Sequence, residues 1–322
     1  MQTDLNPIVL VFPALDRAVK TGLEGRCTLI ETDGADISRL PPEVASAVRA
    51  VACIGRLGNA DIDRLPNLEL IASFGVGYDG IDARHAAARG IVVTNTPNVL
   101  SEEVADATIG LLINAVRQFP RAEAWLRAGH WARGEIYPLS PLSLRGRSVG
   151  IFGLGRIGKA IARRVEAFGL PVAYHNRRPV EDVPYRYHSS LVELARAVDT
   201  LISVVPGGAS TDRVIGREVL EALGQKGVFV NVGRGSTVDE EALIEALGDG
   251  TIAAAGLDVF ASEPAVPKRL LDLDNVTVLP HIAAATVDTR AAVGRLVVDN
   301  VLNWFAHGRA LTPVPESAAV RA

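Results

Sequence analysis

Three residues of complementary chemistry stand far apart in the sequence: Arg234, Glu263 and His281. Arg234 and His281 each follow an apolar run, so both are expected at the carboxyl end of a strand, where open α/β sheets bind ligands. An imidazole can donate or accept a proton near neutral pH, and a carboxylate beside it fixes its tautomer and stabilises the imidazolium. A guanidinium binds carboxylates through charge-assisted hydrogen bonds. Together the three predict proton transfer on a substrate that carries a carboxylate.

Each of these residues also has a simpler interpretation. Arg234 lies between two glycines, as in an ordinary surface turn, and Glu263 precedes a proline, as many loop charges do. Asp258, at the end of the preceding apolar run, is an alternative partner for the imidazole. Of the six histidines, His281 has the context best suited to acid–base chemistry.

A glycine-rich segment supplies a second signal, with glycines at Gly153, Gly155 and Gly158. It lies between an apolar run at 148–152 and a helical apolar pattern over 157–168, which is the strand, turn and helix of a dinucleotide-binding fingerprint. In that interpretation the first glycine makes the turn, the second admits the pyrophosphate, and the third lets helix and strand pack closely. The context favours a cofactor site over a merely structural glycine turn.

The residues after the next predicted strand, 171–175, bear on which dinucleotide binds. An NAD-binding protein commonly places a carboxylate there for the adenosine ribose, but this chain has Asn176, Arg177 and Arg178, with no carboxylate before Glu181. Arginine pairs with phosphate through bidentate bonds. The turn therefore favours NADP(H) over NAD(H), the alternative being a solvated basic turn.

Composition narrows the class of protein. The chain has 322 residues, 48% of them hydrophobic, which is enough for two domains with large cores. The net charge of −4 gives no reason to expect nucleic acid or an anionic membrane as a partner. Two cysteines, Cys27 and Cys53, form no disulfide framework, and no spacing marks a metal site. No signal peptide or membrane-spanning run is evident, so we expect a cytoplasmic protein.

Strand-like and helix-like segments alternate along almost the whole chain, which predicts an α/β fold with two doubly wound parallel sheets. The expected arrangement is a discontinuous, flavodoxin-like substrate domain of residues 1–99 and 288–322, a Rossmann dinucleotide-binding and dimerisation domain of residues 100–287, and a cleft between them. Two long helices, 102–119 and 287–305, are expected to flank the second sheet. Strands are predicted at 8–12, 26–30, 51–54, 70–73 and 91–94, and then at 149–152, 172–175, 200–204, 228–231, 253–257 and 276–279.

Four motifs follow one another along the chain: the glycine-rich turn, Val232-Gly233-Arg234-Gly235, Gly256-Leu257-Asp258-Val259-Phe260 with Glu263-Pro264, and Leu279-Pro280-His281. In this order they resemble the D-2-hydroxyacid dehydrogenase family over essentially the whole chain. The basic turn at 176–178, the segment 73–79 and the ending 311–314 make the chain most similar, within that family, to NADPH-dependent glyoxylate/hydroxypyruvate reductases and hydroxyphenylpyruvate reductases.

The resemblance implies a role for each motif. His281 would be the proton donor and acceptor, Glu263 its orienting partner, and Arg234 the cation that binds the substrate. Backbone N–H groups of Val76 and Gly77 would bind the substrate carboxylate, and Asp258 the nicotinamide carboxamide. The remaining cofactor contacts predicted around these motifs are Thr108, Arg156, Ile157, Val205, Pro206 and Val232. The likeness also implies a homodimer.

The expected activity is NADPH-dependent reduction of a small 2-oxo acid, such as glyoxylate, hydroxypyruvate or an aryl-pyruvate, to the D-2-hydroxy acid. Two alternatives stay open at this point. One is an NAD-dependent D-2-hydroxyacid dehydrogenase of another specificity. The other is a non-catalytic, dinucleotide-sensing protein of the corepressor type.

Overall fold

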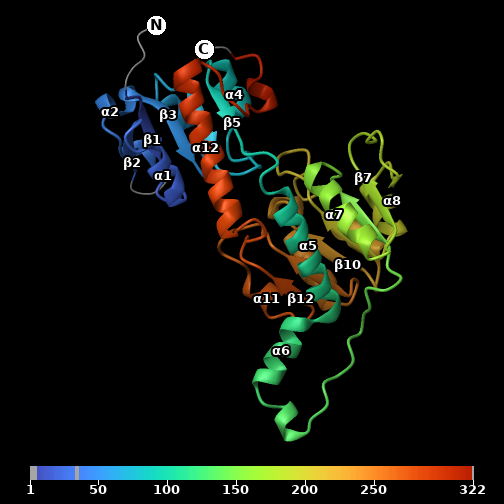
Figure 1. The fold of residues 1–322 in the computed structure, drawn as a ribbon. Helices are drawn as coiled ribbons and strands as arrows, with labels where there is room; N and C mark the ends of the chain where they lie inside the picture. The colour runs from blue at the N-terminus through green and yellow to red at the C-terminus, as the bar shows by residue number, and fades with distance from the viewer. Residues whose placement is uncertain (1–5, 33–35, 321–322) are drawn as a thin grey trace. The chain divides into compact units, whose positions relative to one another are not determined.

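The computed structural model describes residues 6–32 and 36–320, and these form two compact units. One unit contains the chain up to residue 100 together with residues from 286 onward, and the other contains residues 101–285. Each unit is a parallel sheet with helices packed against it (Figure 1). The predicted fold class, with two parallel α/β sheets, is therefore confirmed.

The first unit is built on a five-stranded sheet in the order β2-β1-β3-β4-β5, and all its strand pairs are parallel. Apart from Ile8 and Arg49, the residues of its central strands are buried and rich in valine, isoleucine and alanine, as expected of strands that helices cover on both faces. The strands are β1 (Ile8–Val11), β2 (Thr28–Glu31), β3 (Val48–Cys53), β4 (Leu70–Ser73) and β5 (Val92–Thr94).

Helices and the C-terminal segment complete the first unit. The long helix α12 (Val287–His307) packs against α1 and against β4 of this sheet. Residues 288–322 were expected in the first domain, but this helix was also expected to flank the second sheet, and that expectation was wrong. After α12 the chain returns to β5, where Val314 N–H donates to the carbonyl of Val93 at 2.9 Å. The other helices are α1 (Arg17–Leu23), η1 (Ile37–Arg39), α2 (Pro42–Ala47), α3 (Asn59–Asp63), α4 (Ala83–Ala88) and η4 (Pro315–Ser317).

The second unit has a seven-stranded parallel sheet in the order β12-β11-β10-β9-β6-β7-β8. The first strand, β6, lies between β9 and β7, so the strand order reverses beside it. A ligand crevice is expected at the carboxyl ends of the strands at such a reversal. The strands are β6 (Val149–Phe152), β7 (Val172–His175), β8 (Arg186–Tyr187), β9 (Thr200–Ser203), β10 (Val228–Asn231), β11 (Ala254–Leu257) and β12 (Val276–Val278).

Two groups of helices cover this second sheet. The helix α5 (Ser101–Arg117) packs against α7 (Arg156–Ala167) and against β10 and β11. A separate apolar core forms between the sheet and α8 (Leu191–Ala197), α9 (Arg217–Leu223) and α10 (Glu240–Gly248). The short helix α11 (Lys268–Leu271) lies against β12.

An exposed arm, residues 118–139, extends from the second unit after α5. Gln118 adopts a left-handed conformation with φ +54°, and the proline that follows at position 120 starts α6 (Phe119–Arg127) in a new direction. Figure 1 shows α6, η2 (Trp131–Arg133) and the chain that follows extending beyond the end of α5. Ile136 and Leu139 in this arm are more than 90% exposed.

Two further properties bear on the predictions from composition. Both cysteines are buried and unpaired, and burial raises the pKa of the Cys53 thiol to about 12, so that thiol is unreactive at neutral pH. No helix among the described residues is long and apolar enough to cross a bilayer.

Candidate functional site

The glycine-rich turn after β6 has the geometry that a pyrophosphate needs. Gly153 has φ +105°, which only glycine adopts readily, and a Cβ on Gly158 would overlap the Gly153 carbonyl oxygen. A Cβ on Gly155 would meet no other group within 4 Å, so the backbone there is open to a ligand. The helix α7 begins directly afterwards at Arg156 and Ile157, which directs its N-terminal N–H groups and positive dipole end toward that opening. These residues fit a dinucleotide.

The ends of β9 and β10 lie against the same turn. A Cβ on Gly153 would come within 2.8 Å of the Val205 side chain, and a Cβ on Gly233 within 2.6 Å of the Val205 carbonyl oxygen. Val232 N–H donates to the carbonyl of Ser203 at 3.1 Å. The predicted cofactor contacts Val205, Pro206 and Val232 therefore come together with the glycine turn at one edge of the sheet.

Thr108 lies on α5, away from these loops in sequence. Its side chain is buried, and its hydroxyl donates to the carbonyl of Val104, one turn earlier in the same helix, at 2.6 Å. The described hydrogen bond of Thr108 is therefore internal to the helix.

The basic turn after β7 is joined to the glycine turn by a side chain. The Asn176 carboxamide oxygen accepts the backbone N–H of Leu154 at 2.7 Å. Arg177 and Arg178 follow and are exposed, and no described residue forms a hydrogen bond or ion pair with either guanidinium. The structure thus brings Asn176 to the predicted cofactor site and leaves both arginine heads available.

His281 and Glu263 form a direct pair. The distance from His281 Nδ1 to Glu263 Oε2 is 2.7 Å, and the other carboxylate oxygen of Glu263 accepts the backbone N–H of Phe260 at 2.9 Å. The His281 side chain is 49% exposed, so its second nitrogen can reach a ligand. With Nδ1 donating to Glu263, Nε2 is the ring atom that can exchange a proton with a substrate.

Asp258 holds the backbone of the histidine loop rather than the imidazole. Its buried carboxylate accepts the N–H groups of Ile282 at 2.7 Å and Ala283 at 3.0 Å, while its carbonyl oxygen accepts the N–H of His281 at 2.9 Å. Burial raises the pKa of the Asp258 carboxyl, and these two hydrogen bonds act in the opposite direction. His281 itself has φ +54°, an unusual conformation for a histidine, which these contacts maintain.

Arg234 follows β10, the strand next to β11. Its Nη1 donates to the carbonyl of Gly233 at 2.9 Å, and its own carbonyl accepts the Asn231 side chain at 3.0 Å. A Cβ on Gly235 would overlap the backbone of Phe260, so the Arg234 loop packs directly against the loop that carries Glu263. Arg234, Glu263 and His281 thus follow three adjacent strands, β10, β11 and β12, at the same edge of the sheet.

One residue of this region was missed by sequence reasoning. The Glu240 carboxylate accepts the backbone N–H of Ala261 at 3.0 Å and so supports the loop between Asp258 and Glu263. Glu240 opens α10, where an acidic residue is expected simply as a partner of the helix dipole. Nothing in the sequence distinguishes it from such a residue.

Val76 and Gly77 belong to the first unit, in the loop after β4. Gly75, with φ +133°, donates its N–H to the Thr96 hydroxyl at 3.1 Å, and the Val76 carbonyl accepts from the Asn95 side chain at 2.8 Å. Among the described residues none accepts the N–H of Val76 or Gly77. Two successive N–H groups of this kind can bind an anion.

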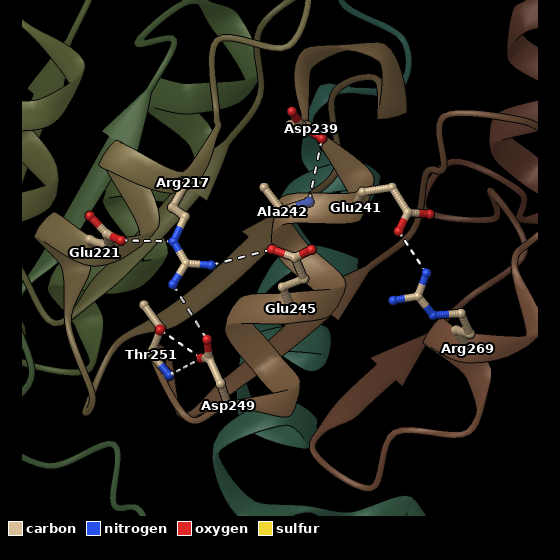
Figure 2. Close-up of polar contacts among 9 residues, drawn as sticks. All are labelled: Arg217, Glu221, Asp239, Glu241, Ala242, Glu245, Asp249, Thr251 and Arg269. Carbon is tan, nitrogen blue, oxygen red and sulfur yellow. Dashed lines mark hydrogen bonds and ion pairs between the residues drawn. The ribbon is translucent and has the colours of Figure 1, made fainter.

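A hollow elsewhere in the second unit does not offer comparable chemistry. It has a volume of about 540 Å³ and is lined by residues of α9, α10 and α11, among them Arg217 and Arg269. Figure 2 shows both guanidiniums engaged: Arg217 with Glu221 at 2.8 Å, and Arg269 with Glu241 at 2.8 Å. We therefore assign the candidate site to the carboxyl ends of the strands.

A protein-family model and several known proteins match this chain over much of its length. A model of the NAD binding domain of D-isomer specific 2-hydroxyacid dehydrogenases matches residues 109–283. A glyoxylate/hydroxypyruvate reductase A of Arabidopsis thaliana is 45% identical over 276 residues, which are 84% of this chain and 86% of that protein. A hydroxyphenylpyruvate reductase of Plectranthus scutellarioides is 44% identical over 273 residues, with the same coverage of 84% and 86%.

A solved structure is also similar to this chain over almost its whole length. The chain is similar to an NADPH-dependent glyoxylate/hydroxypyruvate reductase of Sinorhizobium meliloti, crystallised with NADP and malonate. The TM-score is 0.96 and the sequences are 55% identical, with 98% of this chain and 99% of that chain covered.

Proposed function

The chain belongs to the D-isomer specific 2-hydroxyacid dehydrogenase family, and from this premise we propose that it reduces small 2-oxo acids to D-2-hydroxy acids with NADPH. The substrate class comprises glyoxylate, hydroxypyruvate and aryl-pyruvates, which the names of the relatives support. The observation that carries the proposal is the 2.7 Å pair of His281 and Glu263, on the same sheet edge as a turn that fits a dinucleotide.

The glycine turn, the N-terminus of α7 and the basic turn would hold the cofactor, which supplies a hydride for the carbonyl carbon when bound. His281 would donate a proton from Nε2 to the carbonyl oxygen. Glu263 holds Nδ1–H and stabilises the imidazolium before that transfer. Arg234 would bind the substrate carboxylate and polarise the carbonyl.

Several finer assignments are part of the same proposal. The N–H groups of Val76 and Gly77 would bind the substrate carboxylate. Asp258 would contact the nicotinamide carboxamide, and Thr108 would line the cofactor site. A cytoplasmic location is consistent with the two buried, unpaired cysteines.

A substrate panel tests the activity. NADPH consumption is measured with glyoxylate, hydroxypyruvate, pyruvate, phenylpyruvate and 4-hydroxyphenylpyruvate, and chiral analysis identifies the product. We expect turnover with at least one of these acids and a D-configured product wherever C2 becomes a stereocentre. Cofactor binding without turnover of any of them would contradict the proposal and favour a dinucleotide-sensing protein.

Cofactor preference gives a first prediction. We expect kcat/KM with NADPH to exceed that with NADH by at least about tenfold, because a charge-assisted phosphate–arginine contact exceeds the ~1.4 kcal/mol that tenfold requires. Replacing Arg177 and Arg178 together by alanine should remove the difference, mainly through KM for NADPH. The exposed arginine of α8, Arg196, provides a control, and Arg196→Ala should keep the preference.

Assembly gives a second prediction. The arm exposes Trp131, Ile136 and Leu139, and exposed apolar side chains gathered on one segment are typical of an interface. Light scattering at micromolar concentration should give a mass near twice 34.1 kDa. The double variant Ile136→Asp and Leu139→Asp should shift the mass toward that of a monomer, whereas Leu271→Asp, at a half-exposed position of α11, should not. A wild-type monomer would refute the prediction.

A further inference from the structure

The basic turn, residues 176–180, is fixed at both of its ends by tyrosine hydroxyls. The Tyr187 hydroxyl donates to the backbone carbonyl of Asn176 at 3.2 Å. At the other end, the backbone N–H of Val180 donates to the Tyr174 hydroxyl at 2.9 Å. Arg177 and Arg178 lie between these two anchors.

The two tyrosines come from paired positions on neighbouring strands. Tyr174 of β7 is opposite Tyr187 of β8 in the strand register, and their ring centroids are 5.5 Å apart. Tyr174 is buried, so its hydroxyl is fixed by the surrounding core. The strand β8 has only two residues, and one of them is Tyr187.

Further contacts hold this short strand in place. His175, the last residue of β7, lies with its ring stacked between Phe152 and Tyr187, at centroid distances of 5.7 and 6.3 Å. The His175 Nδ1 is 2.8 Å from the carbonyl oxygen of His188, the residue after Tyr187. The position of the Tyr187 hydroxyl is therefore defined by the packing of its ring against His175 and by the contact between His175 and the His188 carbonyl just after the strand.

The turn is also connected to the rest of the cofactor site, but through a different group. The Asn176 side chain accepts the Leu154 N–H of the glycine turn, whereas the tyrosine hydroxyls form hydrogen bonds with the backbone of the basic turn. Loss of Asn176 should therefore disturb both phosphate-binding elements. Loss of a tyrosine hydroxyl should disturb only the segment that carries the two arginines.

We propose that Tyr187 and Tyr174 are positioning residues that order the basic turn for the 2′-phosphate of the dinucleotide. The inference rests on the proposed NADPH preference. Two long, exposed arginines can hold a phosphate only if their backbone is ordered. When the backbone is already ordered in the free protein, binding does not have to offset the entropy lost on ordering it. The hydroxyls thus contribute to the selection of cofactor through the backbone of the basic turn.

Tyr187→Phe tests the proposal, because it removes the hydroxyl and keeps the ring in its stack. Isothermal titration of the full-length protein with NADPH, NADH, adenosine 2′,5′-bisphosphate and 5′-AMP measures binding independently of turnover. One net hydrogen bond corresponds to about a fivefold change in an equilibrium constant. We expect the Kd for NADPH and for the bisphosphate to rise about fivefold, with less than a twofold change for NADH and 5′-AMP.

Tyr185→Phe is the matched control. Tyr185 lies two residues before Tyr187, and its hydroxyl donates to Glu166 on α7 at 2.9 Å rather than to the basic turn. This variant should bind all four ligands as the wild type does. Tyr174→Phe, which leaves the Val180 N–H without its acceptor, should reproduce the selective loss shown by Tyr187→Phe.

The outcomes separate the inference from the function on which it rests. If Tyr187→Phe weakens the binding of NADPH and of NADH equally, the hydroxyl has a general structural role and the proposal is overturned. This holds whether or not the variant also has a lower melting temperature. Unchanged binding of all four ligands would overturn it as well. A wild-type protein that binds NADPH and NADH equally would instead refute the cofactor preference itself, and the positioning role with it.

Discussion

Replacing His281 by alanine should lower kcat for 2-oxo acid reduction by about 10²- to 10⁴-fold, the range that general acid catalysis contributes. The reason is geometric: Nδ1 is held by Glu263 at 2.7 Å, so Nε2 of a half-exposed ring is the group able to protonate the developing alkoxide. Initial rates at saturating NADPH and substrate measure the effect. Titration with NADPH alone should give a Kd near that of the wild type, because His281 follows β12 and the phosphate-binding turns follow β6 and β7.

The role of the pair predicts the direction of the pH dependence. Reduction requires the imidazolium and oxidation the neutral ring, so the rate of reduction should fall and the rate of oxidation rise as pH increases. Glu263→Gln removes the carboxylate that accepts Nδ1–H of His281 and should lower kcat for reduction. If His281→Ala kept more than about a tenth of the wild-type kcat, well outside the expected range, another group would have to be the proton donor.

Many of the carboxyl ends of the strands could be predicted from the sequence because most strands of the second sheet are short, largely apolar segments that end near a polar, glycine or proline residue. That pattern located the ends of β6, β10 and β12 within a residue. Since parallel strands share one edge for their carboxyl ends, residues distant in sequence, such as Arg234 and His281, were expected at the same edge of the sheet.

Other features have no comparable signal in the sequence. The strand β8 has two residues, too few for any periodicity, yet it carries Tyr187. Asp258 offers its carboxylate to two backbone N–H groups 24 and 25 residues later, a contact that depends on the close approach of two loops. The helix α12 was expected to flank the second sheet, although most of its residues were assigned to the first domain, because amphipathic spacing shows that a helix has a buried face and does not identify what buries it.

Arg234→Ala should lower kcat for the 2-oxo acid by about 10²- to 10³-fold and should also raise its KM, so that kcat/KM falls further than kcat. Loss of one preorganised donor to a developing oxyanion typically costs that factor in kcat, and loss of the carboxylate contact raises KM in addition. The loop that carries Arg234 is fixed by Asn231 and by the packing of Gly235 on Phe260, so the backbone should keep its place in the variant.

Arg234→Lys separates charge from geometry at this position. Lysine keeps the positive charge but lacks the planar fork that binds a carboxylate through two parallel bonds, so its activity should fall between those of the wild type and the alanine variant. Steady-state kinetics with glyoxylate and hydroxypyruvate, together with NADPH titration, check both variants. A loss of NADPH affinity as large as the loss in kcat/KM would place Arg234 in the cofactor site instead. A kcat/KM reduced less than about tenfold in Arg234→Ala would remove it from substrate binding altogether, because that is well below the cost of losing a charge-assisted contact.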